Sequence, residues 1–143
     1  MNFDMDKSLG FILNRTSLAS KTGFNQLIKD YGISPEQWSV IFRVVQHSGI
    51  SQKELADSTY KNQGNLTRMI DKLVEKEYLK RALDKSDRRA IQLFATDKSI
   101  ALVDEVVPLS NAFNQKLTDG FDESEKVKLI ELLNRVYNNI QKD

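Results

Sequence analysis

Apolar residues recur every three or four positions along most of this 143-residue chain, a pattern that predicts amphipathic helices. The first segment covers about residues 9–28, and Gly32 suits the end of that helix. In the motif ISPEQW, Ser34 is a good N-cap, and Gln37 completes a capping box that begins a second helix. This helix is expected to end at the Ser48-Gly49 break.

Two closely spaced helix starts follow that break. Ser51 is placed to cap a helix that must be short, because Ser58 and Thr59 are weak helix formers. Asn62 is placed to cap a longer helix, whose apolar residues keep a helical spacing throughout: Leu66, Met69, Ile70, Leu73 and Val74. A short helix, a brief turn and a second helix with one apolar face predict a helix-turn-helix.

Two short β-compatible runs come next, at residues 78–83 and 90–95, with DKSDRR between them. Six residues are many for a hairpin turn, so the loop should project from the molecule. Thr96 can cap a further helix, which Pro108 should kink, and Asp122 begins the last one. We therefore expect a mainly α fold with a small β hairpin.

Composition narrows the class of protein. A hydrophobic content of 40% and a charged content of 29% are ordinary for a soluble globular protein. There is no signal peptide and no run of about 18 apolar residues, so we expect a cytoplasmic protein. With one histidine, no cysteine and no Gly-rich phosphate loop, we expect neither an enzyme nor a bound metal or cofactor.

The net charge of +1 hides an asymmetry along the chain. Residues 51–95 contain ten basic and seven acidic side chains, whereas residues 96–143 contain six basic and nine acidic ones. The basic excess therefore coincides with the predicted helix-turn-helix and hairpin, and this is where an anionic partner is expected.

The exposed face of the predicted fourth helix carries side chains that suit a DNA major groove. When the helix is projected at about 100° per residue, this face contains Lys61, Gly64, Asn65, Arg68, Asp71, Lys72 and Glu75. Asn can pair with adenine and Arg with guanine through two hydrogen bonds each, while Gly64 permits close approach. Gln63 and Thr67 flank the face. The alternative is an ordinary solvated face of mixed charge.

The DKSDRR loop places Arg88 and Arg89 where they could enter a minor groove, whose negative potential attracts guanidinium groups. Phosphate would repel Asp84 and Asp87, so we expect these aspartates to hold the shape of the loop. The alternative is a solvated, salt-bridged turn.

These motifs together resemble the MarR family of bacterial transcriptional regulators. The matching runs are SQKELA, NLTRMIDKLVEK and DKSDRRA followed by alternating apolar residues, and the order of elements agrees over essentially the whole chain. The resemblance implies a winged helix-turn-helix over about residues 34–95. It also implies dimerisation helices at about residues 1–31 and 97–143 within one MarR-type domain.

The resemblance also implies a function. We expect a sequence-specific DNA-binding regulator, a repressor that binds double-stranded DNA at an inverted-repeat operator as a homodimer and is associated with the bacterial nucleoid. Ser51 falls where the preceding helix approaches a phosphate. The predicted DNA-binding residues are Ser51, Lys61, Gln63, Gly64, Asn65, Thr67, Arg68, Lys72, Lys85, Arg88 and Arg89.

Three positions depart from the family pattern. Glu77 stands where relatives commonly have the glycine that ends the recognition helix, so this junction should be capped differently. Gly64 and Asn65 replace small hydroxyl residues, which changes the expected base preference. Thr59 and Lys61 occupy positions that are often apolar in relatives.

The apolar stripes of the first and last helices predict a two-fold dimer, which would match a palindromic site. The alternative is that they pack on each other within one chain.

Relatives often bind a small aromatic effector beside these helices, and the residues expected to line such a site are Phe11, Arg15, Trp38 and Phe42. A different reading of the whole chain is a winged-helix protein–protein interaction module without DNA binding. It would require apolar residues where Asn65, Arg68 and Lys72 stand.

Overall fold

The computed structural model describes residues 1–59, 62–86 and 90–142, apart from the side chain of Gln63. The chain forms two compact units, Met1–Ser110 and Asn111–Asp143. Helices and strands follow one another in this order: η1 Met5–Lys7, α1 Leu9–Ile28, η2 Lys29–Tyr31, α2 Pro35–Gln46, β1 Ile50–Ser51, α3 Gln52–Ser58, α4 Gln63–Glu75, β2 Leu79–Leu83, β3 Ile91–Ala95, α5 Asp97–Leu117 and α6 Glu123–Gln141. None of the helices described is long and apolar enough to cross a membrane.

The helices begin at the predicted N-caps. The side chains of Ser34 and Gln37 form a full capping box at the start of α2. Asn62 Oδ1 accepts a hydrogen bond of 2.8 Å from the backbone N–H of Asn65 at the start of α4. Before α5, Thr96 and Ser99 cap each other's backbone N–H groups.

Asp122 caps α6, and this contact affects its titration. The backbone N–H of Glu125 donates to the Asp122 carboxylate and, together with the Ser124 hydroxyl, lowers the pKa of this carboxyl below its usual value. Glu125 returns the contact by accepting a hydrogen bond from the backbone N–H of Asp122, which completes the predicted box.

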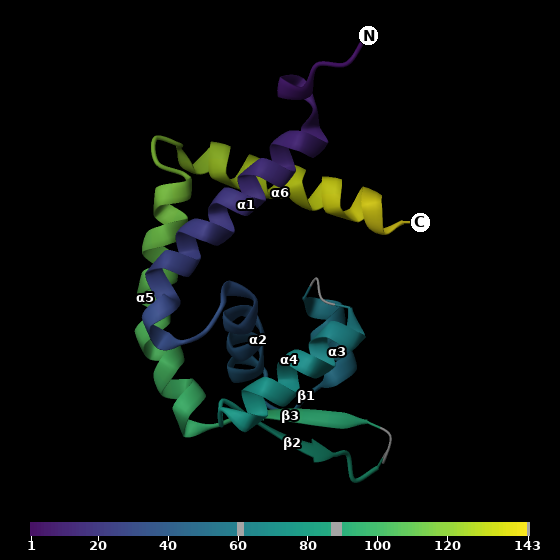
Figure 1. Ribbon diagram of the computed structural model, residues 1–143, viewed down its shortest axis with the longest axis vertical. Helices are drawn as coiled ribbons and strands as arrows, with labels where there is room; N and C mark the ends of the chain where they lie inside the picture. The colour runs from purple at the N-terminus through teal and green to yellow at the C-terminus, as the bar shows by residue number, and fades with distance from the viewer. Residues whose placement is uncertain (60–61, 87–89, 143) are drawn as a thin grey trace. The chain divides into compact units, whose positions relative to one another are not determined.

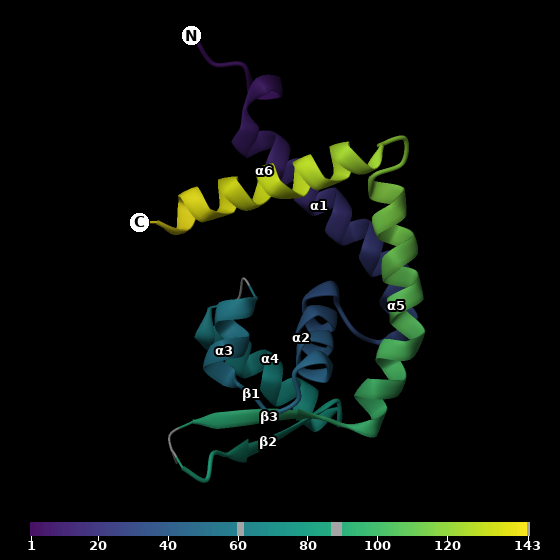
Figure 2. The same ribbon diagram turned by 180° about the vertical axis from the view of Figure 1, so that it is seen from behind.

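The sheet has three antiparallel strands in the order β1-β3-β2. The predicted hairpin is confirmed, with Leu79 opposite Ala95 and Leu83 opposite Ile91. The short strand β1 was not predicted, because two residues are too few to show an alternating pattern. α2, α3 and α4 lie on one side of the sheet, and the hairpin extends beyond them (Figures 1 and 2).

One core joins these elements in the first unit. α4 contributes three fully buried side chains, those of Leu66, Ile70 and Leu73. They share the core with buried apolar side chains from the other helices and the sheet: Phe24 and Ile28 of α1, Val40, Ile41 and Val44 of α2, Leu55 of α3, Leu79 of β2, Leu93 of β3, and Leu102 and Val106 of α5. The C-terminal part of α1 is therefore anchored within its own chain.

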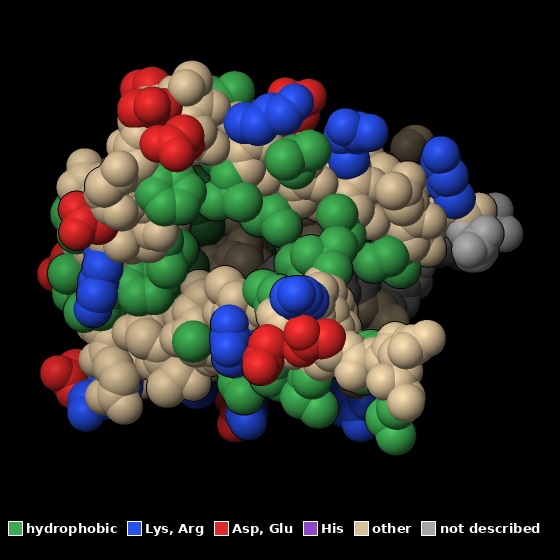
Figure 3. All heavy atoms as spheres, turned by 90° about the horizontal axis from the view of Figure 1, so that it is seen from above, with side chains coloured by type: hydrophobic (Ala, Val, Ile, Leu, Met, Phe, Trp, Pro, Cys, Tyr) green, Lys and Arg blue, Asp and Glu red, His purple; other side chains and the backbone are tan. Residues whose placement is uncertain are grey.

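Hydrophobic side chains are also uncovered at the surface, between charged ones (Figure 3). None of the residues of α6 is buried, and its predicted apolar stripe is exposed throughout: Val127, Ile130, Leu133, Tyr137 and Ile140. In the first unit, Leu9 and Leu18 of α1 are exposed as well.

The C-terminus of α4 ends in a left-handed residue that is not glycine. Glu77 has a φ of 66°, its N–H donates to the carbonyl of Val74, and the N–H of Tyr78 donates to the carbonyl of Leu73. These two bonds are those of a Schellman motif, in which glycine is the favoured residue at the left-handed position. The expectation that this junction would be capped differently is therefore wrong: Glu77 takes the left-handed conformation that glycine usually takes. This conformation costs free energy, because a Cβ atom disfavours positive φ.

Neighbouring side chains hold the same junction. Thr96 Oγ1 donates to the carbonyl of Glu77 over 2.7 Å. Lys98 Nζ donates to the carbonyl of Lys76 over 2.7 Å and lies 4.4 Å from the ring centre of Tyr78. A cation at a helix C-terminus stabilises the unpaired carbonyls there. The path of the chain from α4 into β2 is therefore well determined despite the strained residue.

Replacing Glu77 with glycine should raise the free energy of unfolding by about 1 kcal/mol, because the strain of the left-handed conformation is removed. Urea denaturation of the two proteins measures this difference. The matched control is Glu75→Gly, two residues earlier at the last residue of α4, which should lower stability by up to about 1 kcal/mol. Equal destabilisation by both substitutions would contradict the strain at Glu77.

Candidate nucleic-acid interface

The two sides of α4 differ completely in burial. The apolar side is packed into the core, so the opposite side faces outward, and Gly64, Asn65, Arg68 and Lys72 are all exposed. The predicted polar face therefore exists as a continuous exposed surface. α4 is the second helix of the helix-turn-helix, and we call it the recognition helix.

Two of the predicted base-reading side chains are held together. Arg68 Nη2 donates a hydrogen bond of 2.9 Å to Asn65 Oδ1 on the preceding turn of the helix. This contact occupies only part of the donor capacity of the guanidinium group, which has five N–H groups. Asn65 and Arg68 are thus oriented by each other before any partner arrives, which reduces the rotamer entropy lost on binding.

A second contact ties the recognition helix to α3. Gln52 Nε2, in the first residue of α3, donates a hydrogen bond of 2.8 Å to Thr67 Oγ1. Thr67 is therefore oriented by a residue that the sequence did not single out. The hydroxyl of Ser51, just before Gln52, accepts from the backbone N–H of Glu54 over 3.0 Å and caps α3. As a hydroxyl group, Ser51 retains one O–H donor.

Gly64 is not required by the fold of the chain itself. Its φ is not positive, and an added Cβ would lie 3.6 Å from Asn62 Oδ1, which is an ordinary contact. Glycine at an exposed helical position costs about 0.5–1 kcal/mol relative to alanine. The missing side chain leaves this part of the surface open to close approach from outside.

Asp71 lies on the same exposed stripe, one turn beyond Arg68, and is paired with the hairpin. Its Oδ1 is 2.6 Å from Nη1 of Arg81 in β2. The acidic charge on this face is thereby matched by a basic one from a different element. The pair also joins the recognition helix to the hairpin.

The hairpin β2–β3 and its loop form the wing. Asp84 Oδ1 accepts from the backbone N–H of Ser86 over 2.8 Å and from its hydroxyl over 2.7 Å, and the N–H of Asp84 donates to the carbonyl of Ala90. The structural role predicted for Asp84 is confirmed by these bonds. Lys85 is exposed beside it. Four other residues of the sequence-based interpretation, Lys61, Asp87, Arg88 and Arg89, lie outside the described residues.

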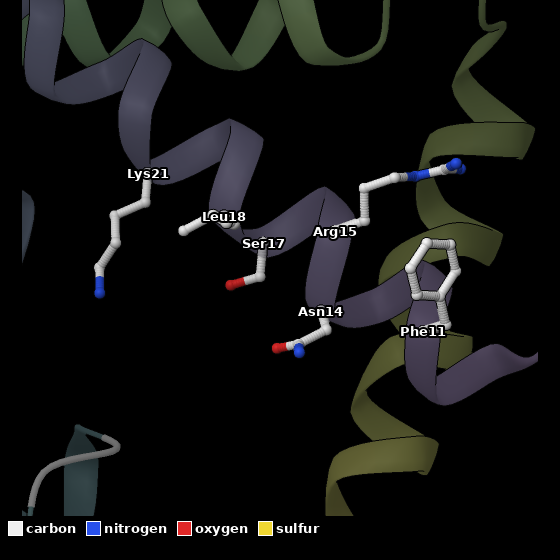
Figure 4. Close-up of a pocket in the computed structure, with 6 residues that line it drawn as sticks. All are labelled: Phe11, Asn14, Arg15, Ser17, Leu18 and Lys21. Atoms are coloured by element: carbon white, nitrogen blue, oxygen red, sulfur yellow. The ribbon is translucent and has the colours of Figure 1, made fainter.

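Of the predicted effector residues, Phe11 and Arg15 lie together in α1. The guanidinium carbon of Arg15 is 5.5 Å from the ring centre of Phe11. Both line an open hollow of about 580 Å³ along this helix (Figure 4), with Asn14, Ser17, Leu18 and Lys21 as its other lining residues. A cation beside an aromatic ring and polar side chains suits a small aromatic anion.

Trp38 and Phe42 are placed differently. Trp38 belongs to the buried core of α2, and its ring centre is 5.6 Å from that of Phe42 in a tilted arrangement. Neither residue lines the hollow on α1. Their predicted role in effector binding remains a prediction, and packing within α2 already accounts for both of them.

Within the described ranges, no group of three or more His, Cys, Asp or Glu side chains is arranged to hold a metal ion. The lone His47 is exposed at the end of α2.

Comparison with known proteins identifies the arrangement. The model of the MarR family matches residues 33–91, which include α2, α3, α4 and the wing. The regulator MhqR of Bacillus subtilis, an HTH-type transcriptional regulator, is 27% identical over 129 residues, which is 90% of this chain and 88% of MhqR. Residues 33–91 of this chain thus match the MarR family, and the relatives of similar sequence are transcriptional regulators.

Solved structures agree on the fold. BpsR of Bordetella bronchiseptica, from work on the regulation of its DNA binding by 6-hydroxynicotinic acid, superposes with a TM-score of 0.89 at 23% identity. The match covers 96% of this chain and 98% of BpsR. A cysteine-to-serine mutant of E. coli MarR complexed with operator DNA gives a TM-score of 0.85 at 23% identity, covering 95% and 98% of the two chains. The winged-helix fold is thus confirmed.

Sequence reasoning missed two residues that organise the candidate interface. Gln52 orients Thr67, and Arg81 pairs with Asp71. Both contacts join different elements, so the periodicity within one helix or strand gives no signal for them. A basic residue in a strand that follows a helix with an exposed acidic residue is a weak signal at most, because an exposed strand commonly carries basic residues.

Proposed function

We propose that this regulator binds an inverted-repeat operator as a homodimer and represses transcription from a cytoplasmic, nucleoid-associated position. The observation that carries the proposal is the recognition helix, in which Leu66, Ile70 and Leu73 are buried while Asn65 and Arg68 are exposed and already joined by a hydrogen bond. These two residue types form two hydrogen bonds each with adenine and guanine in the major groove. The DNA complex of MarR supports the same use of this fold.

The remaining predicted contacts have distinct roles in this proposal. Lys72 and Lys85 supply positive charge toward phosphates, and Ser51 can donate its O–H to one. Gln63, Gly64 and Thr67 lie along the recognition helix beside Asn65 and Arg68. Lys61 and the wing arginines, Arg88 and Arg89, are proposed to contact the backbone and the minor groove, respectively.

Arg68→Ala should relax base preference at one position of each half-site, by about 1–3 kcal/mol. Duplexes enriched from a random pool by the unchanged protein provide the operator, and mobility shifts on its point variants measure the preference. Lys72→Ala is the control on the same helix: it should weaken all variants equally and reduce the salt dependence of binding. An equal loss across all variants for Arg68→Ala would make it a phosphate contact.

The dimer is supported by the exposed apolar stripe of α6. Five large apolar side chains on one side of this helix, from Val127 to Ile140, are uncovered in the single chain. A two-fold partner that covers them would bury surface that otherwise stays in water.

Ile130→Glu should weaken self-association at least about tenfold, because a carboxylate would be buried in an apolar contact. Sedimentation velocity measures the dimer, and circular dichroism checks that the helices persist. Lys128→Ala, on the other side of α6, should leave the dimer intact. A dimer unaffected by Ile130→Glu would place the interface elsewhere.

We further propose that a small aromatic anion relieves repression by binding at the hollow on α1. Phe11 supplies a ring and Arg15 a cation there, and the lining includes the polar Asn14 and Ser17. BpsR, whose DNA binding is regulated by an aromatic acid, supports an effector of this class.

Benzoate, used as a probe, should release the enriched operator duplex in a mobility-shift titration. Arg15→Ala should raise the concentration required about tenfold, since a charge-assisted contact is lost. Release at the same concentration by both proteins would place the effector site elsewhere, and no release by benzoate would argue against this ligand class.

A protein-binding module without a DNA role is the alternative function. Such a module would use exposed apolar residues on the recognition helix. The exposed residues observed there, Asn65, Arg68 and Lys72, are polar or basic and favour DNA.

A further inference from the structure

We infer that Asp71 and Arg81 act as a positioning pair for DNA binding: the pair holds the wing against the recognition helix and cancels a negative charge that would otherwise face the phosphate backbone. The inference rests on the proposed function. It assigns a role in binding to two residues that need not touch DNA themselves.

The position of Asp71 gives the first argument. The residue follows Arg68 by one turn on the exposed stripe that is proposed to face DNA. An unpaired carboxylate at this place would be repelled by the closely spaced phosphates of a duplex. Arg81 Nη1 lies 2.6 Å from Asp71 Oδ1, so the negative charge is matched by a positive one at contact distance.

The Asp71–Arg81 pair also holds the wing in place relative to α4. Arg81 is the middle residue of β2 and lies opposite Leu93 of β3, the fully buried residue at the centre of the sheet. The chain also joins α4 to β2 directly, through the short junction at Glu77 and Tyr78. The ion pair adds a contact further along the strand, so that the wing cannot pivot about the junction without breaking it. Two groove-binding elements held as one unit lose less entropy on binding than two that move independently.

The pair contributes little to the stability of the fold. Both side chains remain partly exposed, and exposed ion pairs generally add little to folding free energy. Its loss should therefore affect DNA binding much more than unfolding, which separates a positioning role from a purely structural one.

A double-mutant cycle on the enriched operator duplex tests the inference. Arg81→Gln should weaken binding about tenfold, because it removes the tie and also leaves Asp71 charged and unpaired. Asp71→Asn should weaken binding only about threefold, because it removes the tie alone, and the double variant should match Asp71→Asn within about twofold. Arg81→Lys should retain most of the affinity. Urea denaturation should give nearly equal stabilities for all variants.

Lys80→Gln, the neighbouring residue of β2, removes the same charge without breaking the pair and should weaken binding less than Arg81→Gln. Losses that multiply in the double variant, with a reduced salt dependence, would make Arg81 a direct phosphate contact and overturn the inference. Full affinity of Arg81→Gln would also overturn it. If the unchanged protein enriches no duplex, the proposed function is contradicted, and the inference with it.

Discussion

The burial of one side of α4 is the interaction on which the rest of the structure depends. Leu66, Ile70 and Leu73 are fully buried, and each side chain of this kind contributes about 1.5–3 kcal/mol when it leaves water. This packing sets the rotation of the helix about its own axis. Gly64, Asn65 and Arg68 consequently face outward, and no rearrangement of the surface can turn them inward without exposing the core.

Packing sets the rotation of α4, and polar contacts then orient the side chains that it exposes. Asn65 and Arg68 orient each other along the helix, whereas Gln52 and Arg81 reach the same helix from α3 and β2. The buried side of α4 thus determines which residues are presented, and the polar contacts determine how they are presented. We propose that the wing and the recognition helix approach DNA as one body and that the exposed stripe of α6 is a separate surface that pairs two chains.

Local signals explain how much of this could be predicted from sequence. The N-caps at Ser34, Asn62 and Asp122 depend on residues within one turn of the chain, and the structure confirms them. The exposed polar face followed from helical periodicity alone. By contrast, β1 exists only because β3 is beside it, and the pairing of Asp71 with Arg81 depends on how β2 turns back along α4. The junction at Glu77 lies between these cases: a departure from the family pattern marked the position, but only the backbone shows that Glu77 takes the left-handed conformation.

We propose that the exposed side of α4 reads the major groove. Replacing single guanines of the enriched operator by 7-deazaguanine tests it most directly, because this removes the N7 acceptor from the major groove and leaves the minor groove unchanged. We predict that at least one such replacement in each half-site weakens binding of the unchanged protein by about 1–3 kcal/mol. The Arg68→Ala variant should bind the replaced and the natural duplex equally well. If no 7-deazaguanine replacement affects the unchanged protein, while minor-groove changes do, the account of this helix is wrong.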